Sequence, residues 1–133
     1  MDETGGKKAT DAGAGVVVVL NRDLMFGSQI RAVLRALGHE ARFARDTSGF
    51  LAALREAGES ASRGVVDMNG TVDWAAIAEF TGETGRAPLL GFGPHVDVEG
   101  RKAAKRAGID RIVSNGDFHR DAATLVTRYA RRV

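Results

Sequence analysis

The chain has 133 residues, of which 44% are hydrophobic and 27% charged, and these values are ordinary for a single soluble globular domain with a real core. It contains no cysteine, which excludes disulfides, thiolate metal sites and cysteine nucleophiles. The longest apolar run is too short to span a bilayer, no signal peptide is visible and the net charge is only +2, so we expect a cytoplasmic protein without a membrane or nucleic-acid partner.

The chain begins with a polar segment and then a buried strand. Residues 1–14 are rich in glycine and hold no periodic apolar residues, so we expect a disordered tail. The β-branched run at 16–20 predicts a strand that is buried on both faces. Asp23 then caps a helix of apolar residues at helical spacing, which Gly38 ends.

The middle of the chain repeats this alternation. Residues 39–45 alternate between polar and apolar and predict a short edge strand. Thr47 or Ser48 can cap the helix that follows. The apolar residues at 64–67 predict a third strand, and Asp73 is placed to cap the next helix.

The C-terminal part continues the same pattern. Residues 87–93 predict a fourth strand, which is followed by a helix that Gly108 ends. A fifth strand is expected at 109–113. Asp117 or Asp121 starts the last helix.

Five strands that alternate with helices imply an α/β domain with a mostly parallel sheet covered on both faces. Ligands of such sheets bind beyond the carboxyl ends of the strands. We therefore expect any site in the loops that follow the strands, at residues 21–23, 45–46, 67–70, 91–95 and 114–117.

Three stretches of sequence resemble the receiver domain of bacterial two-component response regulators: "RAVLRALGHEARFA" (31–44), "GVVDMN" (64–69) and "KRAGIDRIV" (105–113). The resemblance implies one receiver-like domain at 15–133, a doubly wound (βα)5 flavodoxin-like three-layer sandwich with strand order 2-1-3-4-5. It also implies a regulatory role in signal transduction through protein–protein contacts, rather than an enzyme.

The resemblance places two residues in the phosphorylation site of the family. Asp67 matches the phosphoacceptor aspartate, and Asn69 matches the position whose backbone carbonyl binds Mg²⁺. An alternative is that Asp67 is a strand-end aspartate that accepts hydrogen bonds from loop N–H groups.

The other site positions depart from the family pattern. Asn21 and Arg22 stand where the metal-binding acidic pair is expected, and the nearby Asp23 is better used as a helix cap. The Ser/Thr position falls on Gly93, and the Lys position falls on Ser114.

These departures leave a poor site for Mg²⁺, which requires several oxygen ligands and strong negative charge. We therefore expect a degenerate receiver, or pseudo-receiver, without metal or cofactor, in which Asp67 is at most a vestigial phosphoacceptor. We expect Arg22, or another basic loop residue, to pair with Asp67 and to hold the loops in one state.

Two other functions stay open. "VVDMNGTV" and "IVSNGDFHRD" resemble motifs of haloacid-dehalogenase-type phosphatases, which would make Asp67 a nucleophile and Asp117 and Asp121 metal ligands. Asn69 stands where that family has its general acid, and an amide cannot transfer the proton. Alternatively, the loops at "GFGPH" and "SNGDF" could bind a small anion or nucleotide through backbone N–H groups.

The receiver resemblance also implies a dimerisation surface, formed by the fourth helix, fifth strand and fifth helix of the family. Both charges occur on this surface, and we expect a homodimer through a self-complementary two-fold contact. The residues concerned are Lys102, Lys105, Arg106 and Arg111 against Asp110, Asp117 and Asp121.

Overall fold

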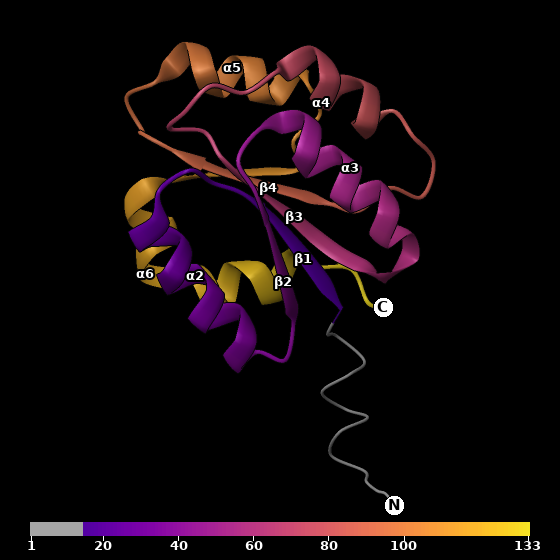
Figure 1. Ribbon diagram of the computed structural model, residues 1–133. Coiled ribbons are helices and arrows are strands. Elements are labelled where there is room, and N and C mark those ends of the chain that lie inside the picture. The colour runs from indigo at the N-terminus through magenta and orange to yellow at the C-terminus, as the bar shows by residue number, and fades with distance from the viewer. Residues whose placement is uncertain (1–14) are drawn as a thin grey trace, which may run out of the picture.

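The computed structural model describes residues 15–133, which form a parallel sheet between two layers of helices (Figure 1). The expected tail at 1–14 lies outside the described residues. The strand order is β2-β1-β3-β4-β5, which confirms the predicted α/β fold and its topology. The strands are β1 (Val16–Leu20), β2 (Glu40–Ala44), β3 (Ala61–Asp67), β4 (Leu89–Gly93) and β5 (Arg111–Ser114).

The helices divide between the two faces of the sheet. The three helices α3, α4 and α5 cover one face, and α2 and α6 cover the other (Figure 1). A 3₁₀ turn, η1, follows α3 directly. The bounds are α2 (Leu24–Ala36), α3 (Thr47–Ala57), η1 (Gly58–Ser60), α4 (Trp74–Thr81), α5 (Val98–Arg106) and α6 (Asn115–Tyr129).

Strand β1 lies inside the sheet and is buried on both faces, as its run of β-branched residues predicts. Val18 and Leu20 pack in the core under α3, α4 and α5, whereas Val17 and Val19 pack in the core under α2 and α6. Each fully buried valine contributes about 1.5–3 kcal/mol relative to an exposed one. The strand therefore fixes the loop at its carboxyl end relative to both helical layers.

Two of the four predicted helix caps are wrong. Asp23 and Asp73 cap α2 and α4 as predicted. Asp46 caps α3, because the hydroxyl of Thr47 accepts a hydrogen bond from the Asp73 backbone instead. Ser114 caps α6, which therefore begins before the predicted aspartates.

Strand β3 begins at Ala61, earlier than the predicted start at 64. The prediction left out Ser62 and Arg63 because they are polar, but both are buried within the strand. Strands β4 and β5 begin later than predicted, at Leu89 and Arg111. Within the part of the chain that the structure describes, no helix is both long and apolar enough to cross a membrane.

Candidate functional site

The carboxyl ends of β1 and β3 and the start of α6 bring one aspartate and three asparagines together. Asp67 ends β3, which pairs with β1 on one side and β4 on the other. Asn21 follows β1, Asn69 lies in the turn after β3, and Asn115 is the first residue of α6. The sheet topology therefore places the polar residues at the edge where ligands of such folds bind.

Both carboxylate oxygens of Asp67 accept hydrogen bonds from asparagines. Asn21 donates from Nδ2 to Oδ2 at 2.8 Å, and it is itself buried. Asn69 donates to Oδ1 twice, from its backbone N at 2.9 Å and from Nδ2 at 2.8 Å. The backbone bond is one that a strand-end aspartate makes to a loop N–H group.

Asn69 and Asn115 form a reciprocal amide pair. Asn69 donates from Nδ2 to Oδ1 of Asn115 at 2.9 Å, and Asn115 donates from Nδ2 to Oδ1 of Asn69 at 2.9 Å. The pair ties the turn after β3 to the start of α6. The sequence analysis missed Asn115 because it placed the lysine position of the receiver family on Ser114. The only sequence signal for Asn115 was that a second polar residue follows the fifth strand directly.

Ser114 and Gly93 do not supply side chains to Asp67. The hydroxyl of Ser114 accepts the N–H of Asp117 at 3.0 Å and caps α6. A Cβ on Gly93 would lie 3.0 Å from Cβ of Met68, so a serine here would press on the buried Met68. Met68 thus occupies the space beside the position where the receiver family has its hydroxyl.

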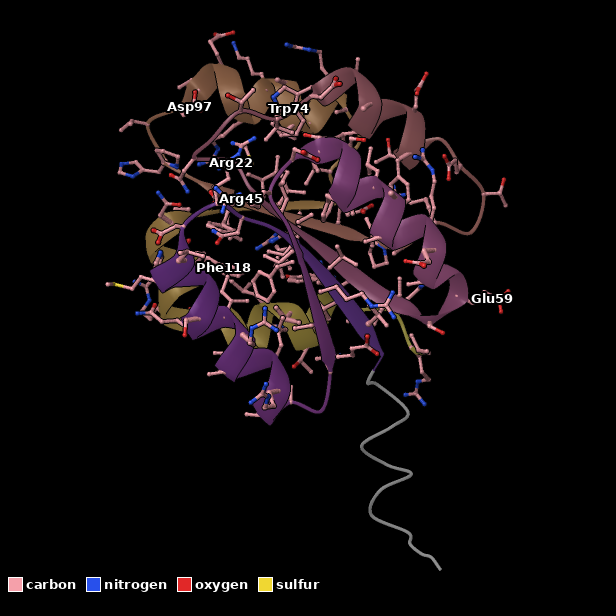
Figure 2. All side chains as sticks on the ribbon, viewed as in Figure 1. Arg22, Arg45, Glu59, Trp74, Asp97 and Phe118 are labelled. Atoms are coloured by element: carbon pink, nitrogen blue, oxygen red, sulfur yellow. The ribbon has the colours of Figure 1, made fainter. Side chains whose placement is uncertain are left out.

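The prediction that Arg22, or another basic loop residue, forms an ion pair with Asp67 is wrong. Within residues 15–133, no cation pairs with this carboxylate. The Arg22 guanidinium lies against Gly70 and points Nη2 at the carbonyl of Thr71, at 3.4 Å. The Asp67 carboxylate already accepts hydrogen bonds from the side-chain amides of Asn21 and Asn69. Figure 2 shows Arg22 and Arg45 at this end of the sheet.

The residues at this edge do not fit a receiver-type magnesium site. They surround a cavity of about 280 Å³ that includes two carboxylates, Asp67 and Asp23. Asp23 accepts the N–H groups of Met25 and Phe26 as a helix cap, and the amides hold Asp67. Mg²⁺ requires octahedral oxygen ligation with strong negative charge, which one amide-bonded carboxylate beside a guanidinium does not provide.

Part of the predicted dimer surface lines a second groove, between α5 and β5; the predicted residues found there are Lys102, Lys105, Asp110 and Arg111, whereas Arg106, Asp117 and Asp121 lie outside its lining. It has a volume of about 460 Å³, an apolar floor with Ile109 and Ile112, and a basic rim that includes Lys102, Lys105 and Arg111. The acidic residues already have intramolecular partners. Asp110 binds Arg86 and the N–H of Leu89, and Arg120 approaches both Asp117 (2.5 Å) and Asp121 (3.8 Å).

The two alternative functions gain little from the geometry. Within the described part of the chain, no three acidic or histidine side chains gather to hold a metal, so Asp117 and Asp121 do not join Asp67 as the phosphatase motifs require. In the "SNGDF" loop one N–H group is used locally, since the hydroxyl of Ser114 accepts the N–H of Asp117.

Comparisons with known proteins identify the fold. No protein-family model and no curated protein sequence matches the chain. Solved structures do. The receiver domain of the sensor histidine kinase PA1611 from Pseudomonas aeruginosa PAO1, crystallised with a magnesium ion in its active-site cleft, superposes with a TM-score of 0.73 and 13% identity over 87% of this chain and 97% of that one.

Two further neighbours are similar over nearly their whole length. The chemotaxis protein CheY4 of Vibrio cholerae has a TM-score of 0.70 and 14% identity over 87% of this chain and 98% of that one. The CheY-like protein TadZ of P. aeruginosa PAO1 has a TM-score of 0.66 and 16% identity, covering 86% and 98%. The chain therefore has the fold of response-regulator receiver domains, at a sequence identity of 13–16% to these three.

Proposed function

We propose that this chain is an atypical receiver-like regulatory module, which acts through protein–protein contacts and is not phosphorylated by the Mg²⁺-dependent route. The observation that carries the proposal is that both carboxylate oxygens of Asp67 already accept hydrogen bonds from neighbouring residues. Asn21 and Asn69 donate three hydrogen bonds to its two oxygens at 2.8–2.9 Å. These bonds take the place of the metal and cation that a receiver uses around its phosphoacceptor.

The amide network supports a site that is held in one conformation. A hydrogen bond to a charged group contributes about 1.5–3 kcal/mol to stability. Phosphorylation of Asp67 would displace donors from both oxygens and would add negative charge without a metal to offset it. The reciprocal pair between Asn69 and Asn115 extends the network to α6, so the loops of β1, β3 and β5 are fixed together.

The test is phosphorylation with acetyl phosphate and Mg²⁺, followed by intact-mass measurement. A receiver domain with a full acidic pair serves as the positive control. We expect no phosphoryl adduct on this chain under conditions that modify the control. A triple variant, Asn21→Asp with Arg22→Asp and Ser114→Lys, restores the missing charges and should gain Mg²⁺ binding. Modification of wild-type Asp67 at the control's rate would refute the proposal.

The partner we propose is a second copy of the chain, bound through α5, β5 and α6. Within the described residues, Lys105, Arg106 and Arg111 make no ion pair, and all three are exposed. Asp117 and Asp121 bind only the exposed Arg120, and such surface pairs are worth about 0–1 kcal/mol, so exchanging them across a two-fold contact costs little. Asp110 is held by Arg86, and we expect it to stay internal.

Sedimentation velocity tests this dimer. We expect association at high micromolar concentration that weakens with added salt, because the contact depends on screened charges. The double variant Lys105→Glu with Arg106→Glu should be monomeric. Arg31→Glu, on α2 and outside the proposed contact of α5, β5 and α6, is the matched control and should behave as wild type. A wild-type chain that stays monomeric at low salt would rule out the homodimer.

A further inference from the structure

Asn69 is followed by a glycine and lies in an exposed turn. Residues 68 and 69 form the turn after β3, and both Asn69 and Gly70 are exposed. Glycine has no side chain to shield its backbone nitrogen, and it restricts the turn least. Among the residues that the structure describes, the N–H of Gly70 has no acceptor. The nitrogen is therefore available for reaction with the neighbouring side chain.

The guanidinium of Arg22 lies directly against Gly70. A Cβ built on Gly70 would lie 2.6 Å from Nη1 of Arg22, so the guanidinium rests where a side chain would stand. A nearby positive charge favours the anionic form of an acid. Arg22 thus promotes loss of the Gly70 amide proton, and the resulting amide anion is the nucleophile for attack on an asparagine side chain.

We propose that Asn69 is a site of spontaneous deamidation, and that its product completes a cation site with Asp67. The nitrogen of Gly70 attacks Cγ of Asn69, the new N–Cγ bond closes a succinimide ring, and the Cγ–Nδ2 bond breaks. The amide leaves as ammonia with the proton from Gly70. Water then opens the ring, at Cγ to give aspartate or at the backbone carbonyl to give isoaspartate. One water is consumed, one ammonia is released, and no redox step occurs.

The new carboxylate would alter the site in two ways. Nδ2 of Asn69 lies 2.8 Å from Oδ1 of Asp67, and deamidation replaces this donor with an acceptor. The amide pair with Asn115 loses one of its two hydrogen bonds for the same reason. Two carboxylate oxygens at this separation repel each other unless a cation joins them. Adjacent ligands of an octahedral Mg²⁺ lie roughly 2.9 Å apart, as metal–oxygen distances of about 2.0–2.1 Å require.

The same chain contains matched control positions. Asn115 is also followed by a glycine, Gly116, but it lies in the first turn of α6, where the helical backbone holds the next nitrogen away from the side chain. Asn21 is buried and is followed by Arg22. The three asparagines share one hydrogen-bond network, so a difference in their rates reports backbone freedom and the identity of the next residue.

The experiment incubates the folded full chain in heavy-oxygen water at mildly alkaline pH, and peptide mass spectrometry then follows label at each asparagine. We expect label at Asn69 to accumulate several-fold faster than at Asn115, with none at Asn21. In urea, the rates at Asn69 and Asn115 should converge. Arg22→Gln should slow labelling at Asn69 alone, and Gly116→Ala should leave it unchanged. Labelling at Asn69 no faster than at Asn115 in the folded chain would overturn the assignment.

The cation site is tested separately with Mn²⁺ titration of Asn69→Asp, which mimics the aspartate product. We expect saturable binding that wild type and Asp67→Asn with Asn69→Asp both lack. Asn115→Asp adds one carboxylate elsewhere in the network and is the matched control. Equal Mn²⁺ binding by Asn69→Asp and wild type would overturn the cation site. Deamidation is measured without phosphate or metal, so it can fail or succeed independently of the proposed function.

Discussion

Replacing Arg63 with methionine should stabilise this protein, because the arginine is a fully buried cation. Its side chain has 0% exposure within β3, and none of its guanidinium nitrogens has an acceptor among residues 15–133. The nearest compensation is the ring of Tyr129, whose centroid lies 5.8 Å from the guanidinium carbon. Burial lowers the pKa of Arg63 from its ordinary value to about 10, although the carboxylate of Asp110 opposes the effect.

The expected size of the effect follows from this pKa. The decrease from the ordinary arginine value to about 10 corresponds to roughly 3 kcal/mol of unfavourable free energy for the charged form, at about 1.4 kcal/mol per pKa unit. Methionine is shorter and leaves a small cavity, which costs about 1–2 kcal/mol. Loss of the contact with Tyr129 costs about 0.5–1 kcal/mol more. A net stabilisation of about 1 kcal/mol remains, in line with the replacement of other buried charges by apolar residues.

Urea unfolding at neutral pH measures the change. We expect Arg63→Met to raise the midpoint with an unchanged m-value. The folded-state pKa is depressed, so the penalty is complete below about pH 10. It is relieved as the pH rises above this value toward the unfolded-state pKa, and the gap between variant and wild type should narrow there. Arg31→Met is the control, since Arg31 is exposed and lies 4.5 Å from the Phe43 ring. Destabilisation by Arg63→Met of about 1 kcal/mol or more would refute the reasoning.

Three further predictions concern stability. Burial lowers the pKa of His39 below 6.5. The stability that the neutral side chain contributes is therefore complete above pH 6.5 and is lost as the pH falls through the folded-state pKa. His39→Asn should flatten this pH dependence of the free energy of unfolding, measured by urea titrations at a series of pH values. Gly64→Ala should destabilise by about 1–3 kcal/mol in the same assay, because its Cβ would lie 2.6 Å from Leu89. Arg131→Ala should lower the melting temperature through a loss of about 1–2 kcal/mol, since its guanidinium binds three carbonyls, while Arg132→Ala at the exposed neighbour should stay within about 0.5 kcal/mol.

The fold could be predicted from the sequence because its signals are local. The run at 16–20 contains only β-branched and aliphatic residues, and this pattern leaves few structures besides a strand buried on both faces. The cap of α3 could not be predicted, because Asp46, Thr47 and Ser48 are all good caps. The hydrogen bond from the Asp73 backbone to Thr47 decides between them, and that contact spans 26 positions.

The site was predictable only in part, for a related reason. The position of Asp67 follows from strand order alone. The direction of the Arg22 side chain depends on competition for Asp67 by Asn21 and Asn69, and on the open space over Gly70. Charge alone favoured an ion pair, but short amide side chains reach the carboxylate with less loss of rotamer freedom than an arginine.

The departures from the receiver pattern at this edge are physically coupled. Met68 is buried, and its side chain runs over β4 where side chains would otherwise stand. A Cβ on Gly91 would lie 2.9 Å from the Met68 sulfur, and one on Gly93 would lie 3.0 Å from the Met68 Cβ. A hydroxyl at position 93 therefore requires a smaller or displaced residue at 68, next to Asp67. Because Met68 also packs in the core with α3 and α4, such a change loses apolar contacts as well. A side chain introduced at Gly93 would therefore press on Met68 and, through it, on the packing of the domain.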